Sequence, residues 1–243
     1  MNTLKDRLPP LGQFGPFIAL LIACVVFGLT TDRFFSGDNF SLILQQVTVV
    51  GVIAIGQTLI ILTGGIDLSC GMIMALGSIV MTKFAADLGL PAPLAILAGI
   101  VVTAGFGLIN GLLVTRIKLP PFIVTLGTLN IAFAITQLYS AAQTVTDVPP
   151  MMTWLGSTFV VGGTNVAYGT VLMILMYLGV WFWLRETAAG RHVLGSLVGA
   201  VVVGVLRNGL TLMSVSSVYQ VLITGVLVIV AVAVDQLTRK GAR

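Results

Sequence analysis

The sequence predicts an all-α protein, a polytopic transmembrane helix bundle in which some helices are broken or re-entrant. Of its 243 residues, 57% are hydrophobic and only 8% are charged, whereas a soluble domain carries about 25% charged residues. The mean hydropathy is +1.09, so the expected solvent is a bilayer rather than water. The apolar stretches are continuous and lack the two-residue alternation of a membrane β-barrel.

Eight apolar segments are candidate membrane helices, because a spanning helix needs roughly 20 apolar residues. They cover residues 14–31, 41–62, 69–87, 92–114, 121–141, 165–184, 194–213 and 216–236. The connection 142–164 contains Pro149–Pro150 and Gly162–Gly163, which argue against a simple helix there, and its Trp154 is a candidate interfacial anchor. The length suits one helical bundle, so we expect a single transmembrane domain over residues 1–243.

The basic residues predict the orientation, because cytoplasmic loops of membrane proteins are enriched in Lys and Arg. With a cytoplasmic N-terminus and eight crossings, the residues that fall inside are Lys5, Arg7, Arg116, Lys118, Arg185, Arg191, Arg239, Lys240 and Arg243. Only Arg33 and Lys83 fall outside. This bias predicts that both termini are cytoplasmic.

Several function classes are disfavoured by composition and motifs. The net charge of +4 is explained by the cytoplasmic loops and indicates no nucleic-acid partner. Cys24 and Cys70 lie in or beside apolar segments and are interpreted as packing residues, and His192 alone cannot form a zinc site. The chain has no phosphate-binding Gly-x-x-x-x-Gly-Lys-Ser/Thr loop and no catalytic set, so we expect no enzyme, cofactor or metal.

The first informative motif lies at the end of the second apolar segment. A helix that carries Gln57 runs into Gly64 and Gly65, and paired glycines break a helix because they adopt backbone angles that other residues avoid. Asp67 or Ser69 can then cap the next helix. An acid so close to apolar helices must face protein or water. Two compatible interpretations remain, a plain helix cap and a broken helix that lines a transport path.

The second motif opens the fifth apolar segment. Pro120 and Pro121 fit the first turn of a helix, where the missing N–H group is no loss. Thr125, Gly127 and Thr128 place small and hydroxyl groups early in this helix. Such groups suit a path for a polyhydroxylated solute, or the hydroxyls bond back to the preceding turn.

Two further motifs carry charge. Arg185, Glu186, Gly190, Arg191 and His192 belong to a short charged cytoplasmic loop, which either anchors the topology or contacts a partner. Arg207 and Asn208 lie inside the seventh apolar segment. An arginine there is expected to face the bundle or an aqueous path, or to snorkel toward an interface.

Together these motifs resemble the ribose-type branch of ABC importer permeases, in the right order and over nearly the whole chain. The matching stretches are Gly56 to Gly71, Pro120 to Thr128, Gly190 to His192, Leu206 to Leu210, Val215 to Ser217, and Asp235–Gln236. Each stretch alone is a weak signal. As a set they indicate the family specifically.

The resemblance implies a permease subunit in the bacterial inner membrane that translocates a monosaccharide such as ribose. The implied partners are cytoplasmic ABC ATPase subunits, a periplasmic sugar-binding protein and a second permease chain in a homodimer, with lipid around them. Candidate residues of the translocation path are Gln57, Gly64, Gly65, Asp67, Ser69, Pro121, Thr125, Gly127 and Asn208. Candidate residues of the loop that couples to the ATPase are Arg185, Glu186, Gly190, Arg191 and His192.

One departure from the family pattern follows His192. Family members look longer by roughly a third of this chain, and here Arg191–His192 runs directly into a stretch that resembles a later helix. We therefore expect an internal deletion with a junction near 193–194, which would remove the coupling helix. The alternatives are a non-transporting remnant or assembly partner of an intact permease, and an ion-coupled secondary transporter that uses Asp67 and Arg207.

Overall fold

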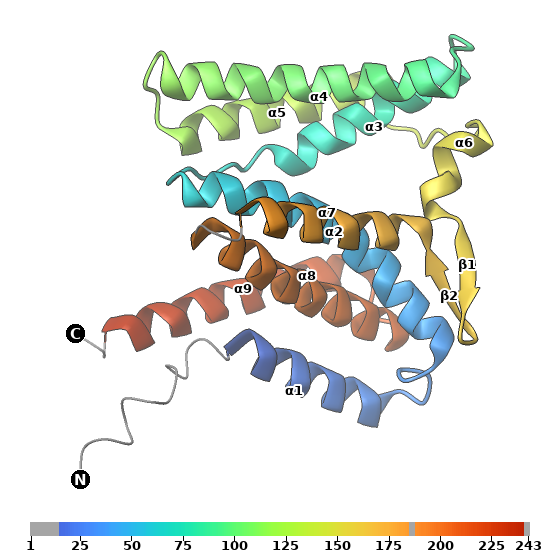
Figure 1. Ribbon diagram of the computed structural model, residues 1–243, viewed down its shortest axis with the longest axis vertical. Coiled ribbons are helices and arrows are strands. Elements are labelled where there is room, and N and C mark those ends of the chain that lie inside the picture. The colour runs from blue at the N-terminus through green and yellow to red at the C-terminus, as the bar shows by residue number, and fades with distance from the viewer. Residues whose placement is uncertain (1–14, 185–187, 241–243) are drawn as a thin grey trace. The chain divides into compact units, whose positions relative to one another are not determined.

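The computed structural model describes residues 15–184 and 188–240, which are mainly helical (Figure 1). This confirms the all-α prediction. The long helices within these ranges are α1 (Gly15–Thr30), α2 (Gly37–Leu62), α3 (Cys70–Ala86), α4 (Ala92–Thr115), α5 (Pro121–Ser140), α7 (Tyr168–Leu184), α8 (Ala188–Leu212) and α9 (Ser217–Lys240). Each of the eight predicted apolar segments overlaps one of them.

The connection between α5 and α7 is not a simple helix, as predicted. It contains the short helix α6 (Pro150–Thr153), the 3₁₀ turn η3 (Trp154–Gly156) and an antiparallel hairpin of β1 (Thr158–Val161) and β2 (Thr164–Ala167). Gly162 and Gly163 form the two-residue hairpin loop with φ of 58° and 84°. Positive φ at both positions is what a type I′ hairpin turn requires, and glycine meets that requirement without strain.

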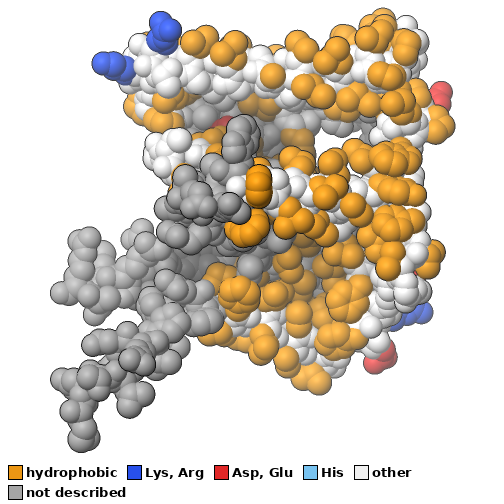
Figure 2. All heavy atoms as spheres, in the orientation of Figure 1, with side chains coloured by type: hydrophobic (Ala, Val, Ile, Leu, Met, Phe, Trp, Pro, Cys, Tyr) orange, Lys and Arg blue, Asp and Glu red, His pale blue; other side chains and the backbone are white. Residues whose placement is uncertain are grey.

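Apolar side chains cover the helices on the face that Figure 2 shows. Three helices are long and apolar enough to cross a bilayer, namely α2, α4 and α5. Among the remaining described helices, α1, α3 and α7 are apolar but shorter, and α8 and α9 contribute the apolar stretches Gly199–Leu212 and Ser217–Leu227. The chain is a multi-pass membrane protein, and eight crossings stay a prediction.

The chain divides into two compact units, with residues 55–157 in one and the flanking segments in the other. In the unit of residues 55–157, α3 packs against α4 and α5. Its apolar core contains Ile73, Leu76 and Val80 of α3 together with Ala132 of α5. Burial of these side chains in a helix-to-helix contact fixes the positions of the polar groups at the ends of the same helices.

The flanking unit joins the first half of α2 to α7. The hydroxyl groups of Thr48 and Thr170 lie 2.9 Å apart, and the Tyr177 hydroxyl donates a hydrogen bond to the Gly51 carbonyl over 3.0 Å. Thr48 precedes Gly51 on α2, and their partners Thr170 and Tyr177 follow in the same order on α7. The two helices therefore run in the same direction. Within this unit α1 also packs against α8, where Gly209 lies against the Phe27 ring.

The charged segment before α8 was predicted as a loop, and this prediction is partly wrong. The helix begins at Ala188, so Gly190, Arg191 and His192 form its first turns. Ala188 and Ala189 explain the earlier start, because alanine is the strongest helix former. The expected junction near 193–194 falls within this continuous helix. Arg185 and Glu186 lie outside the described residues.

Candidate functional site

The candidate site is built on residues 63–69, the non-helical linker between α2 and α3. At the end of α2, the Gly65 amide donates to the Ile60 carbonyl over 3.1 Å and the Gly64 amide donates to Ile61 over 2.9 Å. This pair of bonds is a Schellman motif, in which the residue after the helix is left-handed. Gly64 has a φ of 80°. The helix therefore ends at the paired glycines, as predicted from the sequence.

Asp67 and Ser69 form a turn inside this linker. The Asp67 carboxylate oxygen Oδ1 accepts the Ser69 amide hydrogen over 2.7 Å and the Ser69 hydroxyl over 2.6 Å. The expectation that one of them caps α3 is not met, because the N-cap Ser69 makes no side-chain bond to the helix. Its hydroxyl is instead directed to the carboxylate, which forms the stronger, charge-assisted bond.

Three helices of the same unit hold the linker in place through side-chain hydrogen bonds. Gln57 of α2 donates its Nε2 to the Asp67 carbonyl over 2.6 Å and lies 2.8 Å from the Cys70 sulfur. Asn110 of α4 donates its Nδ2 to the Ser69 hydroxyl over 3.0 Å. Ser69 is fully buried. Because one linker receives bonds from α2 and α4, its non-helical backbone is fixed by the surrounding helices.

Thr125 of α5 provides the third attachment. Its hydroxyl oxygen lies 3.2 Å from the Ile66 carbonyl and 2.9 Å from the Pro121 carbonyl one turn back. The bond back to the preceding turn is one of the two roles expected from the sequence. The contact with Ile66 adds a tertiary role that the sequence did not indicate. Within the described residues, the Thr128 hydroxyl bonds only to carbonyls of its own helix.

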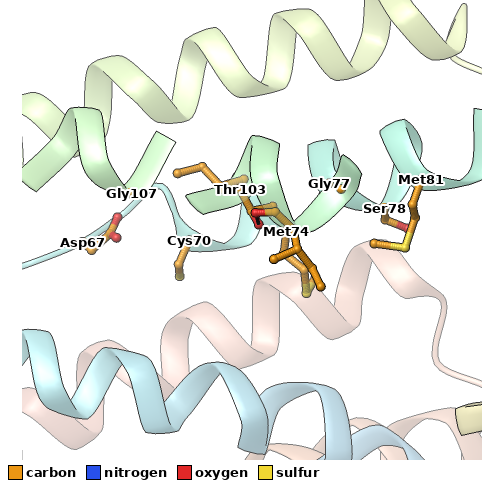
Figure 3. A pocket seen from close by; sticks show the side chains of 11 residues that line it. Asp67, Cys70, Met74, Gly77, Ser78, Met81, Thr103 and Gly107 are labelled. Atoms are coloured by element: carbon orange, nitrogen blue, oxygen red, sulfur yellow. Dashed lines mark hydrogen bonds between the residues drawn. The ribbon is translucent and has the colours of Figure 1, made fainter. Parts of the chain in front are cut away.

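A groove of about 430 Å³ begins at this linker and extends between α3 and α4 (Figure 3). Asp67 and Cys70 lie at one end and Met81 lies at the other. The residues that line it are Asp67, Cys70, Ile73, Met74, Gly77, Ser78, Met81, Gly99, Ile100, Thr103 and Gly107. The lining is mainly apolar, with a carboxylate at one end and two hydroxyl groups farther along.

Glycines set the spacing of the two helices beside the groove. A Cβ atom added to Gly99 would lie 2.8 Å from the Gly77 carbonyl oxygen, closer than real Cβ contacts. The helices can therefore approach only because both positions lack a side chain. The polar side chains of Asp67, Ser78 and Thr103 can form hydrogen bonds with the hydroxyl groups of a solute, and the apolar walls can contact its C–H faces.

The remaining predicted path residues are distributed more widely. Pro121 is the first residue of α5, and Gly127 lies on the exposed side of that helix. Asn208 is buried in α8, in the other unit, and its Oδ1 has no hydrogen-bond partner among the described residues. Within the unit of residues 55–157, the structure thus brings Gln57, Ser69 and Thr125 together around Asp67, whereas Gly127 lies on the exposed side of α5.

Sequence reasoning missed two members of the cluster. Asn110 was overlooked because it lies inside an apolar segment, where an isolated amide between Gly107 and Gly111 was the only signal. Cys70 was interpreted as a packing residue, yet its sulfur contacts the Gln57 amide and borders the groove. For the coupling residues Gly190, Arg191 and His192 only the helical backbone is described.

The comparison with protein families decides the class of protein. Residues 39–194 match the family described as branched-chain amino acid transport system / permease component. This chain belongs to that permease family. The matched region includes the linker, the groove and the hairpin, and the resemblance to ABC importer permeases expected from the motifs is confirmed.

Curated relatives match this permease over most of its length. It is 33% identical to the fructose import permease protein FrcC of Rhizobium meliloti, over 93% of this chain and 86% of the relative. It is 26% identical to the ribose import permease protein RbsC of Bacillus subtilis, with 92% of each chain covered. It is also 26% identical to the D-allose transport system permease protein AlsC of Escherichia coli, over 94% and 93%. No solved structure matches the chain.

Proposed function

We propose that this permease is the membrane-spanning subunit of an ATP-driven importer that translocates a monosaccharide across the bacterial inner membrane. It would act with cytoplasmic ABC ATPase subunits, a periplasmic sugar-binding protein and a second permease chain. The observation that carries the proposal is that relatives aligned over nine-tenths of the chain are named for the import of fructose, ribose and allose. All three are monosaccharides.

The groove beside Asp67 supports the same substrate class. A monosaccharide presents hydroxyl groups around a ring with C–H faces, and the groove offers Asp67, Ser78 and Thr103 among apolar side chains. Only one oxygen of the Asp67 carboxylate is used by Ser69. The second oxygen forms no hydrogen bond within the part of the chain that the structure describes, so it can accept a sugar hydroxyl, and a carboxylate forms stronger hydrogen bonds than a neutral acceptor.

Uptake in proteoliposomes tests this proposal. The chain is reconstituted with an ABC ATPase and a periplasmic sugar-binding protein from the same organism, and the accumulation of radiolabelled fructose, ribose and allose is measured with and without ATP. We expect ATP-dependent accumulation of at least one sugar. Absence of accumulation for all monosaccharides tried, with correctly folded components, would contradict the proposal.

A pair of matched substitutions tests the assignment of the groove. Thr103 and Thr115 both lie on α4, and both hydroxyls bond back to a carbonyl in the preceding turn. Thr103 lines the groove, whereas Thr115 is not among its lining residues. We expect Thr103→Leu to lower the uptake rate by filling the groove and Thr115→Leu to leave it close to wild type. Equal effects of the two substitutions on the uptake rate would contradict the assignment of the groove to the translocation path.

A shortened coupling region is the alternative that a specific observation favours. The alignment with FrcC extends over 309 positions, more than the 243 residues of this chain. The relative therefore carries stretches that have no counterpart here. If one of them is the segment that contacts the ATPase, the chain is a remnant or assembly partner that inserts into the membrane without transporting.

Co-purification separates the two possibilities. The tagged chain is co-expressed with the ABC ATPase used for the uptake measurement and extracted in detergent, and ATP hydrolysis is measured in the purified sample. Stable association with stimulated hydrolysis would mean that residues 185–192 suffice for coupling. A folded, monodisperse chain that leaves the ATPase behind would favour the remnant.

A further inference from the structure

The groove between α3 and α4 carries one carboxylate and no basic side chain. Asp67 lies at one end of it (Figure 3), and none of the other residues that line it is a lysine, an arginine or a histidine. Among the described residues, Lys83 and Asp87 form an ion pair and Asp67 forms none. The negative charge at this end of the groove is therefore not offset by a described side chain of opposite charge.

The Asp67 carboxylate is held in place by neutral groups. Its Oδ1 accepts from the Ser69 amide and hydroxyl, and that hydroxyl accepts from Asn110, whose side chain is 7% exposed. The N-terminus of α3 begins at Cys70 and adds a partial positive charge of about half a unit, which offsets only part of the carboxylate charge. Its Oδ2 forms no hydrogen bond within the described residues. One charged oxygen is thus left for a solute.

The other polar groups that line the groove also favour a solute that donates hydrogen bonds. The Thr103 hydroxyl already donates to the Ile100 carbonyl over 2.9 Å, so its oxygen is left as an acceptor. The Cys70 sulfur lies 2.8 Å from the Gln57 amide nitrogen and accepts from it. Only the Ser78 hydroxyl, among the side chains of the lining, offers a donor as well as an acceptor. Hydroxyl and ammonium groups match this set.

We propose that Asp67 makes the groove selective by charge. The groove accepts a sugar that is neutral or carries a protonated amino group, and it rejects a sugar that carries a phosphate or a carboxylate. This inference rests on the proposed function for the identity of the solute as a sugar, and it adds the residue that decides which charged forms enter.

Repulsion is the physical basis of the rejection. Two like charges repel each other more strongly beside protein than in water, because the effective dielectric constant falls from about 80 to about 20 near a protein surface. Proteins bind phosphate and carboxylate groups with arginine, lysine or free N–H groups. The lining has no basic residue, and the N–H groups at the start of α3 already have the Asp67 carboxylate beside them. Repulsive contacts of this kind are a common source of specificity.

Charge-selective labelling of a cysteine inside the groove tests the proposal without a sugar. Met74 is a suitable position, because it lines the groove one turn after Cys70 and is 43% exposed. Met74→Cys is made in the full-length chain that carries Cys24→Ala and Cys70→Ser. The rates of its reaction with a cationic and an anionic methanethiosulfonate are each divided by the rate with a free thiol. We expect a preference for the cationic reagent of about 3- to 30-fold.

Substitutions of Asp67 identify the source of this preference. Asp67→Asn keeps an acceptor for Ser69 and removes the charge, so the preference at Met74→Cys should fall to that of the free thiol. Asp67→Glu keeps the charge and should keep most of the preference. Gln143→Cys is the matched control, because Gln143 is exposed in the same unit and does not line the groove. Asp67→Asn should leave its labelling unchanged.

Three results would overturn the proposal. A preference that persists in Asp67→Asn would have another source. No preference in the chain with Asp67 would mean that the carboxylate is neutralised or screened. Reaction of Met74→Cys with neither charged reagent, although the denatured chain reacts fully, would mean that the groove is closed to water.

Protection of the same cysteine by sugars extends the test to the solute. Glucosamine, glucose and glucuronate share one ring type and differ in charge at slightly acidic pH. We expect glucosamine to slow the labelling of Met74→Cys at the lowest concentration, glucose at a higher one and glucuronate at none. Asp67→Asn should remove the difference between glucosamine and glucose. Equal protection by all three sugars would contradict the charge selectivity.

The same samples distinguish a failure of this proposal from a failure of the proposed function. If neither these sugars nor fructose, ribose and allose protect the cysteine, while the preference for the cationic reagent depends on Asp67, the groove is selective by charge and the importer of monosaccharides is contradicted. If the sugars protect and the reagents show no preference, the importer stands and the role of Asp67 in selecting charge is contradicted.

Discussion

Asn110 of α4 donates a hydrogen bond to the Ser69 hydroxyl across 41 residues of sequence, over 3.0 Å. The same hydroxyl donates onward to Asp67, so the helix, the serine and the carboxylate form one continuous chain of hydrogen bonds. The Asn110 amide and the Ser69 hydroxyl both donate these hydrogen bonds in a largely buried environment. The position of the groove's carboxylate is consequently set by a residue on another helix.

Replacement of Asn110 by leucine should loosen this chain. The Ser69 hydroxyl would lose its donor, and we expect a loss of about 0.5–1.5 kcal/mol in the free energy of unfolding, the net value of a typical hydrogen bond. Because the Asn110 Oδ1 has no partner among the described residues, its removal limits the loss. Thermal denaturation in detergent measures the effect. Ile109→Ala, at the exposed neighbouring position, is the control, and an equal shift would contradict the role of the bond.

Substitutions of Asp67 should distinguish the role of its oxygen as a hydrogen-bond acceptor from the role of its negative charge. Asp67→Asn keeps an oxygen that can accept from the Ser69 amide and hydroxyl, so the fold should be nearly as stable as wild type. Asp67→Ala removes this acceptor from a buried serine and should cost about 1–3 kcal/mol. If both variants melt like wild type but take up less sugar, the carboxylate serves the solute rather than the turn.

A methyl group at Gly99 should force α3 and α4 apart. The Cβ of alanine would lie 2.8 Å from the Gly77 carbonyl oxygen, which belongs to the backbone and cannot rotate away. We expect Gly99→Ala to lower stability by about 1–3 kcal/mol, as overpacking does, and to lower uptake. Gly105→Ala is the control on the same helix, because its Cβ would meet nothing within 4 Å. A neutral Gly99→Ala would mean that the helices are not in close contact in the membrane.

The direction of the helices predicts which loops share a side of the membrane. Since α2 and α7 run in the same direction, we expect the chain to cross an odd number of times between them, which crossings by α3, α4 and α5 would satisfy. The hairpin then lies on the side of the α1–α2 loop, where Thr164 is next to Gly37.

Cysteine labelling in intact cells checks this arrangement. In the background without Cys24 and Cys70, cysteines at Ser36 and Gly162 should react with an impermeant maleimide, because both loops are expected outside. A cysteine at Lys118 should react only after the membrane is opened. Labelling of Ser36 and Gly162 from different sides would refute the parallel arrangement of α2 and α7.

The sequence predicted the helices better than the elements between them. Long apolar segments identify membrane helices because hydrocarbon leaves no alternative for the backbone. The start of α8 was placed at Leu194 because the continuous apolar stretch begins there, whereas the helix already begins at Ala188 in a charged segment with two alanines. The hairpin was foreseen only as a break, because Gly162–Gly163 is flanked by strands too short to give an alternating pattern.

The site was predicted only where its signals are local. The residues that predict the broken helix lie together in the sequence, namely Gly64, Gly65, Asp67 and Ser69. The bonds from Asn110 and Thr125 join residues 41 and 59 positions apart. A single sequence does not show such pairings, since neither Asn110 nor Thr125 identifies its partner by its own position or chemistry. Asn208 was grouped with the path by its polarity; it is buried in α8 of the other unit, and its role in the path stays a prediction.

The opposite directions of α7 and α8 also restrict which insertions or losses between them leave the rest of the chain unchanged. Because α8 runs opposite to α7 (Figure 1), an insertion or loss between them preserves everything downstream only if it changes the number of crossings by two, four or another even number. Gain or loss of two helices at this point keeps the direction in which α8 and α9 cross, whereas gain or loss of one helix would reverse both.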